Sequence, residues 1–304
     1  MSLIRSGVGS LPHDNCADAV NFVAHSADVA YLPQLPNRHE QESMLVQWGD
    51  GIAGAGQDGT ILRKGATPGD RSEAFLGAAA MLGRVRDPLV KTQATGPVTL
   101  AAALRAGGVE VPNLLDLVVA ELRSRIAQHL EWIRAETSVS EVVLVLDEPA
   151  LAAVSEDPLP LAARRALTAL IAHIDAPVGI HCCGDTDWGE LAEMGFDWLS
   201  WDVGALGHGF LQGVDRIATA LGAGTRVMWG LVPTTRGPLP RPHVLVARYG
   251  TAVANLVVAG APLAKLKSEA WFTPACGLAG LSVGDAEAVV RLLTEVVGEV
   301  ESGW

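Results

Sequence analysis

The sequence predicts a single (β/α)8 TIM barrel, an α/β fold in which parallel strands alternate with helices. Short apolar stretches rich in Val, Ile and Leu alternate with longer helical patterns from end to end. Eight such units in 304 residues match the usual size of this barrel. No long linker or low-complexity segment divides the chain, so residues 1–304 are expected to form one domain. If one strand is miscounted, an open α/β sheet is the alternative.

The predicted strands are apolar runs with β-branched residues inside them and turn residues at their ends. Each is followed by a helical pattern, as the barrel requires. In chain order the predicted strands are Ile4–Leu11, Val29–Leu35, Val90–Thr95, Val142–Asp147, Val178–Cys182, Trp198–Val203, Val227–Val232 and Leu263–Glu269.

The predicted helices carry apolar residues at helical spacing. The last one begins at Ser282, a suitable N-cap, and has Asp285 in its first turn. Two segments exceed a minimal barrel: the glycine-rich stretch Gly49–Gly59, expected to be a long loop or lid, and Leu104–Leu115, expected to separate two helices. The helical patterns include Asp14–Ala27, Ser72–Val85, Leu114–Glu136, Pro160–Ile174, Arg241–Ala259 and Ser282–Val300.

Composition and charge restrict the classes of partner. The formal net charge of −12 argues against a nucleic-acid partner, which would need a basic face. The sequence has no run of eighteen apolar residues, and a basic segment followed by an apolar one is absent from its start. We therefore expect a cytoplasmic protein without a membrane contact. Four cysteines in so long a chain favour metal binding or catalysis over a disulfide framework.

One stretch, Pro177–Gly184, carries the first half of a predicted metal site. It is a short apolar run that ends in a histidine and two cysteines, typical of a buried strand. Because side chains alternate along a strand, His181 and Cys183 point to one side and Cys182 to the other. An imidazole and a thiolate that converge at a strand end supply half of a tetrahedral zinc site.

The second half is expected from two later strand ends, because the carboxyl ends of barrel strands meet at one rim. Asp202 lies at the end of the sixth predicted strand, and Cys276 follows the eighth. With His181 and Cys183 they would complete four-coordination of Zn²⁺ by nitrogen, sulfur and oxygen.

Structural roles compete with these assignments. An Asp at a strand end commonly caps a helix, which is the alternative for Asp202. Cys16 and Cys182 are expected to be small apolar residues of the core. A disulfide between Cys182 and Cys183 is a further, uncommon, possibility.

Lysines inside predicted strands are a second unusual feature, because a buried cation is costly unless it is paired. Lys91 lies in the third predicted strand. Lys265, Lys267 and Glu269 share a face of the eighth, where they would either line the barrel mouth or form a structural layer of ion pairs. The second of these interpretations is favoured.

Six short motifs occur in one order: Gly7-Val-Gly-Ser-Leu-Pro12, Thr95-Gly-Pro-Val-Thr99, Val145-Leu-Asp-Glu-Pro-Ala-Leu151, the His181 and Cys183 pair, the carboxylate Asp202, and Pro274-Ala-Cys-Gly-Leu278. Together they make the chain resemble the C-terminal catalytic half of cobalamin-independent methionine synthase, over nearly its whole length. The glycine motifs are individually weak, whereas all six in this order are specific.

The resemblance implies roles for individual residues. Zn²⁺ would be held by His181, Cys183, Asp202 and Cys276, with Asp202 standing where the family has a longer Glu. The amino-acid substrate would be held by the first-strand motif and by the carboxylate of the fourth strand. Gln47 stands where the family has a glutamate that helps to hold the ammonium group. The implied substrate-binding residues are Val8, Gly9, Ser10, Gln47 and Asp147.

The implied activity is that of a zinc-dependent methyltransferase that activates a thiol, homocysteine in the family, for methylation to methionine. Only the thiolate is a good nucleophile, and zinc coordination removes the thiol proton near neutral pH. The carboxylate of Asp202 is the weakest of the four ligands. It is expected to give way to the incoming sulfur.

Two departures from the family affect the methyl donor. The family's acid histidine is replaced, since Gly230-Leu-Val-Pro-Thr234 offers no proton donor. His208, six residues past Asp202, is the candidate substitute acid, or it caps the helix that follows. The family's N-terminal half, which helps to bind folate, has no counterpart in this sequence. We therefore expect methyl-corrinoid, free or on a small carrier protein, to be the donor.

Two other functions compete with this one. A zinc-bearing barrel could bind a thiol or a corrinoid protein without catalysis, and the missing acid favours that alternative. A uroporphyrinogen-decarboxylase-like barrel would act without this metal and would need arginines around its mouth for several carboxylates. The sequence offers few of them, which makes the decarboxylase the weaker alternative.

Overall fold

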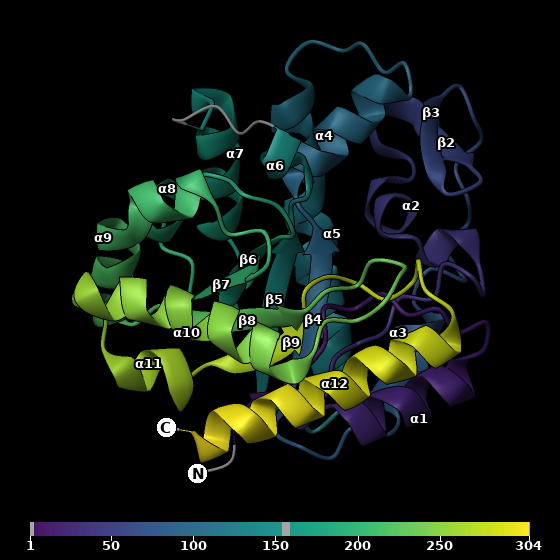
Figure 1. Ribbon diagram of the computed structural model, residues 1–304. Coiled ribbons are helices and arrows are strands. Elements are labelled where there is room, and N and C mark those ends of the chain that lie inside the picture. Colours follow the sequence, from purple (N-terminus) through teal and green to yellow (C-terminus); the bar gives the residue numbers. More distant parts are fainter. Residues whose placement is uncertain (1–2, 154–158, 304) are drawn as a thin grey trace.

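The computed structural model describes residues 3–153 and 159–303 of the chain. Its main element is a curled sheet of seven parallel strands with helices around it, an arrangement consistent with a TIM-like barrel (Figure 1). The strands lie side by side in the order β1-β9-β8-β7-β6-β5-β4. They are β1 (Ile4–Arg5), β4 (Leu89–Thr95), β5 (Glu141–Asp147), β6 (Val178–Cys182), β7 (Trp198–Asp202), β8 (Arg226–Val232) and β9 (Trp271–Pro274).

The predicted second strand, Val29–Leu35, runs between β1 and β4 without forming a named strand. The N–H of Val29 donates to the carbonyl of Arg5 at 3.1 Å, and the N–H of Leu32 donates to the carbonyl of Lys91 at 2.9 Å. Isolated β-bridges occur at Tyr31 and Gln34. Pro33 interrupts the ladder because proline has no N–H group to donate. The segment therefore links the two outer strands of the curled sheet through single hydrogen bonds.

The predicted first strand is also shorter than expected. It ends at Arg5, and the chain beyond it passes Gly7 and Gly9 before the bridge at Ser10. Gly9 has φ +151°, and a Cβ at Gly7 would lie 2.3 Å from the ring of Tyr31. These glycines allow a close backbone approach that a regular strand would not permit.

The prediction of a strand at Leu263–Glu269 is wrong. Residues Leu263–Lys267 form helix α11, and the strand β9 follows it. Pro262 stands at the helix N-cap, and Lys265 pairs with Glu269 one turn later at 2.6 Å. Lys265 and Lys267 lie on this peripheral helix and Glu269 lies in the turn after it, so the interpretation that these residues line the barrel mouth is also wrong.

The glycine-rich stretch Gly49–Gly59 is not only a loop. It contains strand β2 (Ala55–Asp58), which pairs antiparallel with β3 (Ile61–Lys64) in a separate two-stranded sheet. The turn begins at Asp58-Gly59, and Gly59 has φ +62°, a conformation typical of tight hairpin turns. This hairpin lies outside the curled sheet, near α2 (Figure 1).

The predicted helices are present, with ends that differ by at most four residues. The N-cap of the last one is as predicted, since the Ser282 hydroxyl accepts from the N–H of Asp285 at 3.1 Å. No helix of the described residues is both long and apolar enough to cross a membrane. The α-helices are α1 (Cys16–Ser26), α2 (Met44–Gly49), α3 (Leu76–Leu82), α4 (Pro97–Ala106), α5 (Leu114–Glu136), α6 (Ala150–Ala153), α7 (Leu161–Ile171), α8 (Trp188–Glu193), α9 (His208–Ala223), α10 (Pro242–Val258), α11 (Leu263–Lys267) and α12 (Val283–Ser302).

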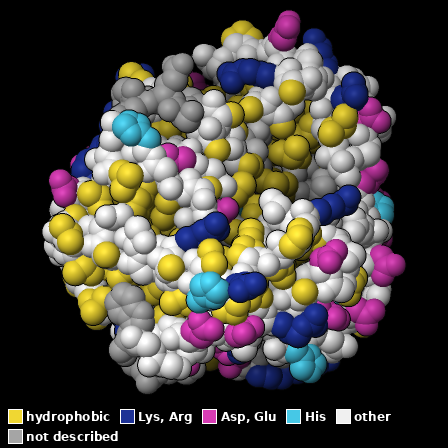
Figure 2. All heavy atoms as spheres, in the orientation of Figure 1, with side chains coloured by type: hydrophobic (Ala, Val, Ile, Leu, Met, Phe, Trp, Pro, Cys, Tyr) yellow, Lys and Arg dark blue, Asp and Glu magenta, His cyan; other side chains and the backbone are white. Residues whose placement is uncertain are grey.

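The interior of the curled sheet is divided into an apolar floor and a polar upper layer. The rings of Trp198 and Trp271 pack at 4.4 Å between centroids, within a buried cluster that includes Val143, Val145 and Met228. Because side chains alternate, the next inward position on β5 after Val145 is Asp147, at the strand's carboxyl end. Seen from the side of Figure 1, the surface is hollowed near its centre, where hydrophobic side chains gather (Figure 2).

Candidate metal centre

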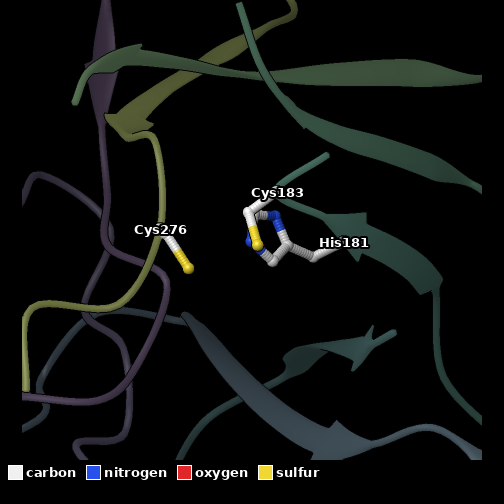
Figure 3. A group of neighbouring side chains, drawn as sticks. All are labelled: His181, Cys183 and Cys276. Atoms are coloured by element: carbon white, nitrogen blue, oxygen red, sulfur yellow. The ribbon is translucent and has the colours of Figure 1, made fainter. Parts of the chain in front are cut away.

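Three of the four predicted metal ligands come together at the carboxyl ends of the strands. His181 lies on β6 and Cys183 follows that strand, whereas Cys276 follows β9. Their side chains point toward one another, and one donor atom from each lies within 4.8 Å of the others (Figure 3). The ligands of a tetrahedral zinc ion lie roughly 3.3–3.8 Å apart, given metal distances of about 2.0–2.3 Å. The three donors therefore fit such an ion after small side-chain rotations.

The imidazole of His181 is oriented for coordination. Its Nδ1 lies 3.0 Å from the hydroxyl of Ser200, the neighbour that faces it from β7. Its Nε2 is buried and has no hydrogen-bond partner among the described residues. Burial, together with the charge of Lys91, lowers the pKa of His181 to about 4, so the ring is neutral. A neutral imidazole with one nitrogen fixed and the other free is the form that binds metals.

Replacing Ser200 by Ala should weaken metal binding without abolishing it. The hydroxyl fixes the ring orientation and tautomer of His181, and partners of this kind typically contribute about 10- to 100-fold in metal affinity. We expect the zinc dissociation constant to rise by roughly tenfold, measured by competition with a chromophoric chelator. Ser6→Ala is the matched control, because Ser6 is also buried and hydroxyl-bonded, to the carbonyl of Val29. Equal affinities of Ser200→Ala and Ser6→Ala would exclude this role for Ser200.

The two thiols form a coupled pair. A hydrogen bond with Cys276 lowers the pKa of Cys183 to about 7, against the effect of burial. The same contact, with burial, raises the pKa of Cys276 far above its usual value. One proton is thus lost easily from the pair and the second is held, because two adjacent thiolates repel each other. A bound divalent cation would remove that repulsion, so the chemistry of this donor set fits zinc.

Asp202 lies close to this group but is not one of its members. It is half-buried at the end of β7, and its Oδ1 accepts from the N–H of Gly204 at 2.7 Å. Burial raises the pKa of its carboxyl group, partly offset by that hydrogen bond. The side chain closes the turn that follows its own strand.

Asp147 supplies a buried carboxylate beside the three donors. It is 6% exposed, and its Oδ1 has no hydrogen-bond partner among the described residues. Burial raises the pKa of Asp147 to about 7, and the ammonium of Lys91 opposes the rise. A buried carboxylate oxygen without a donor is costly, which makes it a candidate for binding a cationic group of a ligand.

The first-strand motif also reaches this region. A Cβ at Gly277 would lie 2.0 Å from the hydroxyl oxygen of Ser10, so Ser10 sits against the residue that follows Cys276. In the part of the chain that the structure describes, the N–H groups of Gly9 and Ser10 donate to no protein acceptor. Val8 precedes them and is buried. These two N–H groups and the hydroxyl could bind an anion.

Gln47 is buried on α2, and its amide is already engaged. Its Oε1 accepts from Gln34 at 2.6 Å, and its Nε2 donates to the carbonyl of Ala74. The helix carrying Gln47 is therefore tied to neighbouring segments through that side chain.

His208 is exposed and is the first residue of α9. The alternative that it caps this helix is wrong. The carboxylate of Asp185 accepts from the N–H groups of Gly209 and Phe210, at 2.9 and 3.3 Å, and so caps the helix instead. The structure leaves the imidazole of His208 facing solvent.

Glu148, next to Asp147, has a structural role that motif reasoning did not assign. Its carboxylate accepts from the N–H groups of Val98 and Thr99, at 2.9 and 2.8 Å, and from the Thr99 hydroxyl at 2.6 Å. It thereby provides acceptors for the free N–H groups in the first turn of α4. A Cβ at Gly96 would collide with the Glu148 side chain at 2.3 Å. Two of the sequence motifs are thus explained by one helix cap.

The chain matches no protein-family model and no curated protein. It is similar in fold to a solved B12-independent methionine synthase from Shewanella sp. W3-18-1 in complex with selenomethionine, with a TM-score of 0.68 and 12% identity over 100% of this chain and 99% of that one. A GH113 β-mannanase from Alicyclobacillus acidocaldarius matches at a TM-score of only 0.43, with 11% identity over 97% and 98% of the two chains. At such low identity the likeness shows a methionine-synthase-like fold.

Proposed function

We propose that this protein is a zinc-dependent methyltransferase that acts on the thiol of homocysteine and forms methionine. The observation that carries the proposal is the group of His181, Cys183 and Cys276, whose donor atoms converge beside the unpartnered carboxylate of Asp147. The likeness to a fold whose solved example binds selenomethionine, a methylated amino acid of the same shape as the product, supports it.

In this proposal His181, Cys183 and Cys276 hold Zn²⁺, with Asp202 as the fourth ligand. When bound, zinc would lower the pKa of a substrate thiol so that it reacts as a thiolate. Asp202 would turn from the N–H of Gly204 toward the donors when no thiol is present. It would return to that N–H when sulfur arrives, so its existing hydrogen bond gives the displaced carboxylate a partner.

In this proposal the remaining polar groups would hold an α-amino acid. Asp147 would accept the α-ammonium, which also removes the cost of its unpartnered oxygen. The N–H groups of Gly9 and Ser10, together with the Ser10 hydroxyl, would take the α-carboxylate. The amide of Gln47 is engaged by Gln34 and Ala74. Its Oε1 has a second lone pair, with which it would help to hold the ammonium group.

The methyl donor is proposed to be a methyl-corrinoid, free or on a small carrier protein. When methyltetrahydrofolate is the donor, the leaving group is a nitrogen that leaves poorly unless it is protonated. A positioned acid should therefore accelerate this transfer. A corrinoid leaves in its reduced form without taking a proton. The only histidine assigned to this role, His208, is exposed at the start of α9 rather than buried beside the donors.

A panel of methyl donors tests this choice. The zinc form is mixed with homocysteine and with either methyl-corrinoid or 5-methyltetrahydrofolate, and methionine is quantified. We expect turnover with methyl-corrinoid to be at least tenfold faster, since an acid typically contributes about 10²- to 10⁴-fold to the folate reaction. Folate-dependent turnover that is lost in His208→Ala but kept in His243→Ala, another exposed helix-start histidine, would show that His208 is the acid.

A further inference from the structure

We propose that Lys91 is a positioning residue, which fixes the first-strand peptide so that its N–H groups can receive the α-carboxylate of the substrate. The inference rests on the proposed function, because it concerns the amino-acid half of the same site. It assigns a role to a buried cation that neither metal binding nor ammonium binding requires.

The surroundings of Lys91 are unusual for a lysine. The residue is 2% exposed on β4, and lysine is almost never fully buried unless it is paired. Among the described residues no carboxylate lies within ion-pair distance of its ammonium. Its Nζ instead donates to the carbonyl of Val8 at 2.5 Å and to Oε1 of Gln93 at 3.4 Å. Burial lowers the pKa of Lys91 to about 8, and the charge of Asp147 opposes this.

The contact with Val8 determines where the next N–H group points. A peptide unit is planar and trans, so the carbonyl of Val8 and the N–H of Gly9 point in opposite directions. With the carbonyl held by Lys91, the N–H of Gly9 is directed away from the ammonium. The N–H groups of Gly7, Val8, Gly9 and Ser10 all lack an acceptor among the described residues, and those of Gly9 and Ser10 are the two that follow the carbonyl held by Lys91.

Gln93, two residues along the same face of β4, supports the arrangement. A Cβ at Gly9, which has φ +151°, would lie 2.4 Å from the Gln93 carboxamide, so the peptide rests directly on that side chain. Nε2 of Gln93 donates to the carbonyl of Leu32 at 2.8 Å. The side chains of Lys91 and Gln93 thereby fix the first-strand motif against β4 and against the neighbouring segment Val29–Leu35.

The far end of the motif lies against the segment that carries Cys276. The hydroxyl of Ser10 lies against Gly277, the residue after Cys276. The spacing between the carboxylate-binding N–H groups and the metal donors is therefore set by the chain from Lys91 through Val8 to Ser10. A thiol that lacks amino and carboxylate groups does not use this spacing, whereas homocysteine does.

The test is the preference of Lys91→Met for homocysteine over 1-propanethiol. Met has a similar length and no charge, and an unpaired buried ammonium is costly, so the variant should fold and hold zinc. We expect 1-propanethiol to bind as it does to the original protein, within about twofold, and homocysteine to bind at least about tenfold more weakly, the loss typical of a misplaced charge-assisted hydrogen bond. Titrations are followed by the sulfur-to-metal charge-transfer absorption of the cobalt-substituted protein. Lys64→Met, a change on the exposed β3 hairpin, is the control.

The outcomes separate this inference from the function on which it rests. A preserved preference in Lys91→Met, when the original protein prefers homocysteine, overturns the role of Lys91 alone. Absence of any preference in the original protein overturns the proposed amino-acid substrate, and the role of Lys91 with it. If Lys91→Met does not fold, Lys91→Gln is compared in the same way. Its shorter amide reaches Val8 less well, so an unchanged preference in that variant also overturns the proposal.

Discussion

Cys276→Ser is expected to lose nearly all of its zinc. A serine hydroxyl is a harder and far less acidic ligand than a thiol, so at neutral pH the site would keep only His181, Cys183 and the weaker carboxylate of Asp202. We expect about one zinc per chain in the original protein and less than about a tenth of that in the variant, after dialysis against a weak chelator. Metal content is measured by atomic emission on protein that was purified without chelator.

Cys182→Ser is the matched control for this loss. Cys182 is fully buried in the apolar core on the opposite face of β6, away from the three donors. The variant should be less stable, because a hydroxyl replaces a packed sulfur, yet it should keep its zinc. Full occupancy in Cys276→Ser, or equal loss in both variants, would contradict the assignment of Cys276.

Asp147→Asn is expected to weaken the binding of homocysteine but not that of simple thiols. The substitution removes the negative charge that would receive the α-ammonium, while the metal donors stay in place. A charge-assisted hydrogen bond contributes about 1.5–3 kcal/mol, so homocysteine should bind roughly 10- to 100-fold more weakly. The affinity for 1-propanethiol should not change. Both are measured by calorimetric titration of the zinc form.

Glu148→Gln provides the control for this second prediction. Glu148 is the neighbouring buried carboxyl, but it caps α4 through the N–H groups of Val98 and Thr99. Its substitution should lower the melting temperature and leave the ratio of the two thiol affinities unchanged. Equal weakening of both thiols in Asp147→Asn would mean that Asp147 supports the site structurally and does not contact an amino acid.

The parts of the site that depend on local periodicity could be predicted from the sequence. The alternation of side chains along β6 placed His181 and Cys183 on one face and Cys182 on the other, and the structure has them so. Helix Leu114–Glu136 has the predicted bounds, because a long apolar pattern is a strong signal. Such features require only neighbouring residues.

Features that depend on tertiary pairing could not be predicted in this way. Ser200 contacts His181 because β6 and β7 are in a particular register, and no local pattern specifies that register. The sequence Leu-Ala-Lys-Leu-Lys at 263–267 fits a strand as well as a helix, and only in the helix do Lys265 and Glu269 lie one turn apart and pair. The role of Lys91 is hidden for a similar reason, since its partner Val8 lies more than eighty residues earlier.

The apolar floor formed by Trp198, Trp271 and their neighbours has a kinetic consequence for the proposed reaction. It fills the interior below Asp147, so reactants would arrive from the carboxyl ends of the strands. Asp147 and Lys91 lie deep, whereas Cys183 and Cys276 are only half-buried. The amino acid must therefore settle before the bulky methyl donor covers it, and its methylated product can leave only after the spent donor departs. Turnover would then follow a compulsory order, with the thiol first on and the product last off.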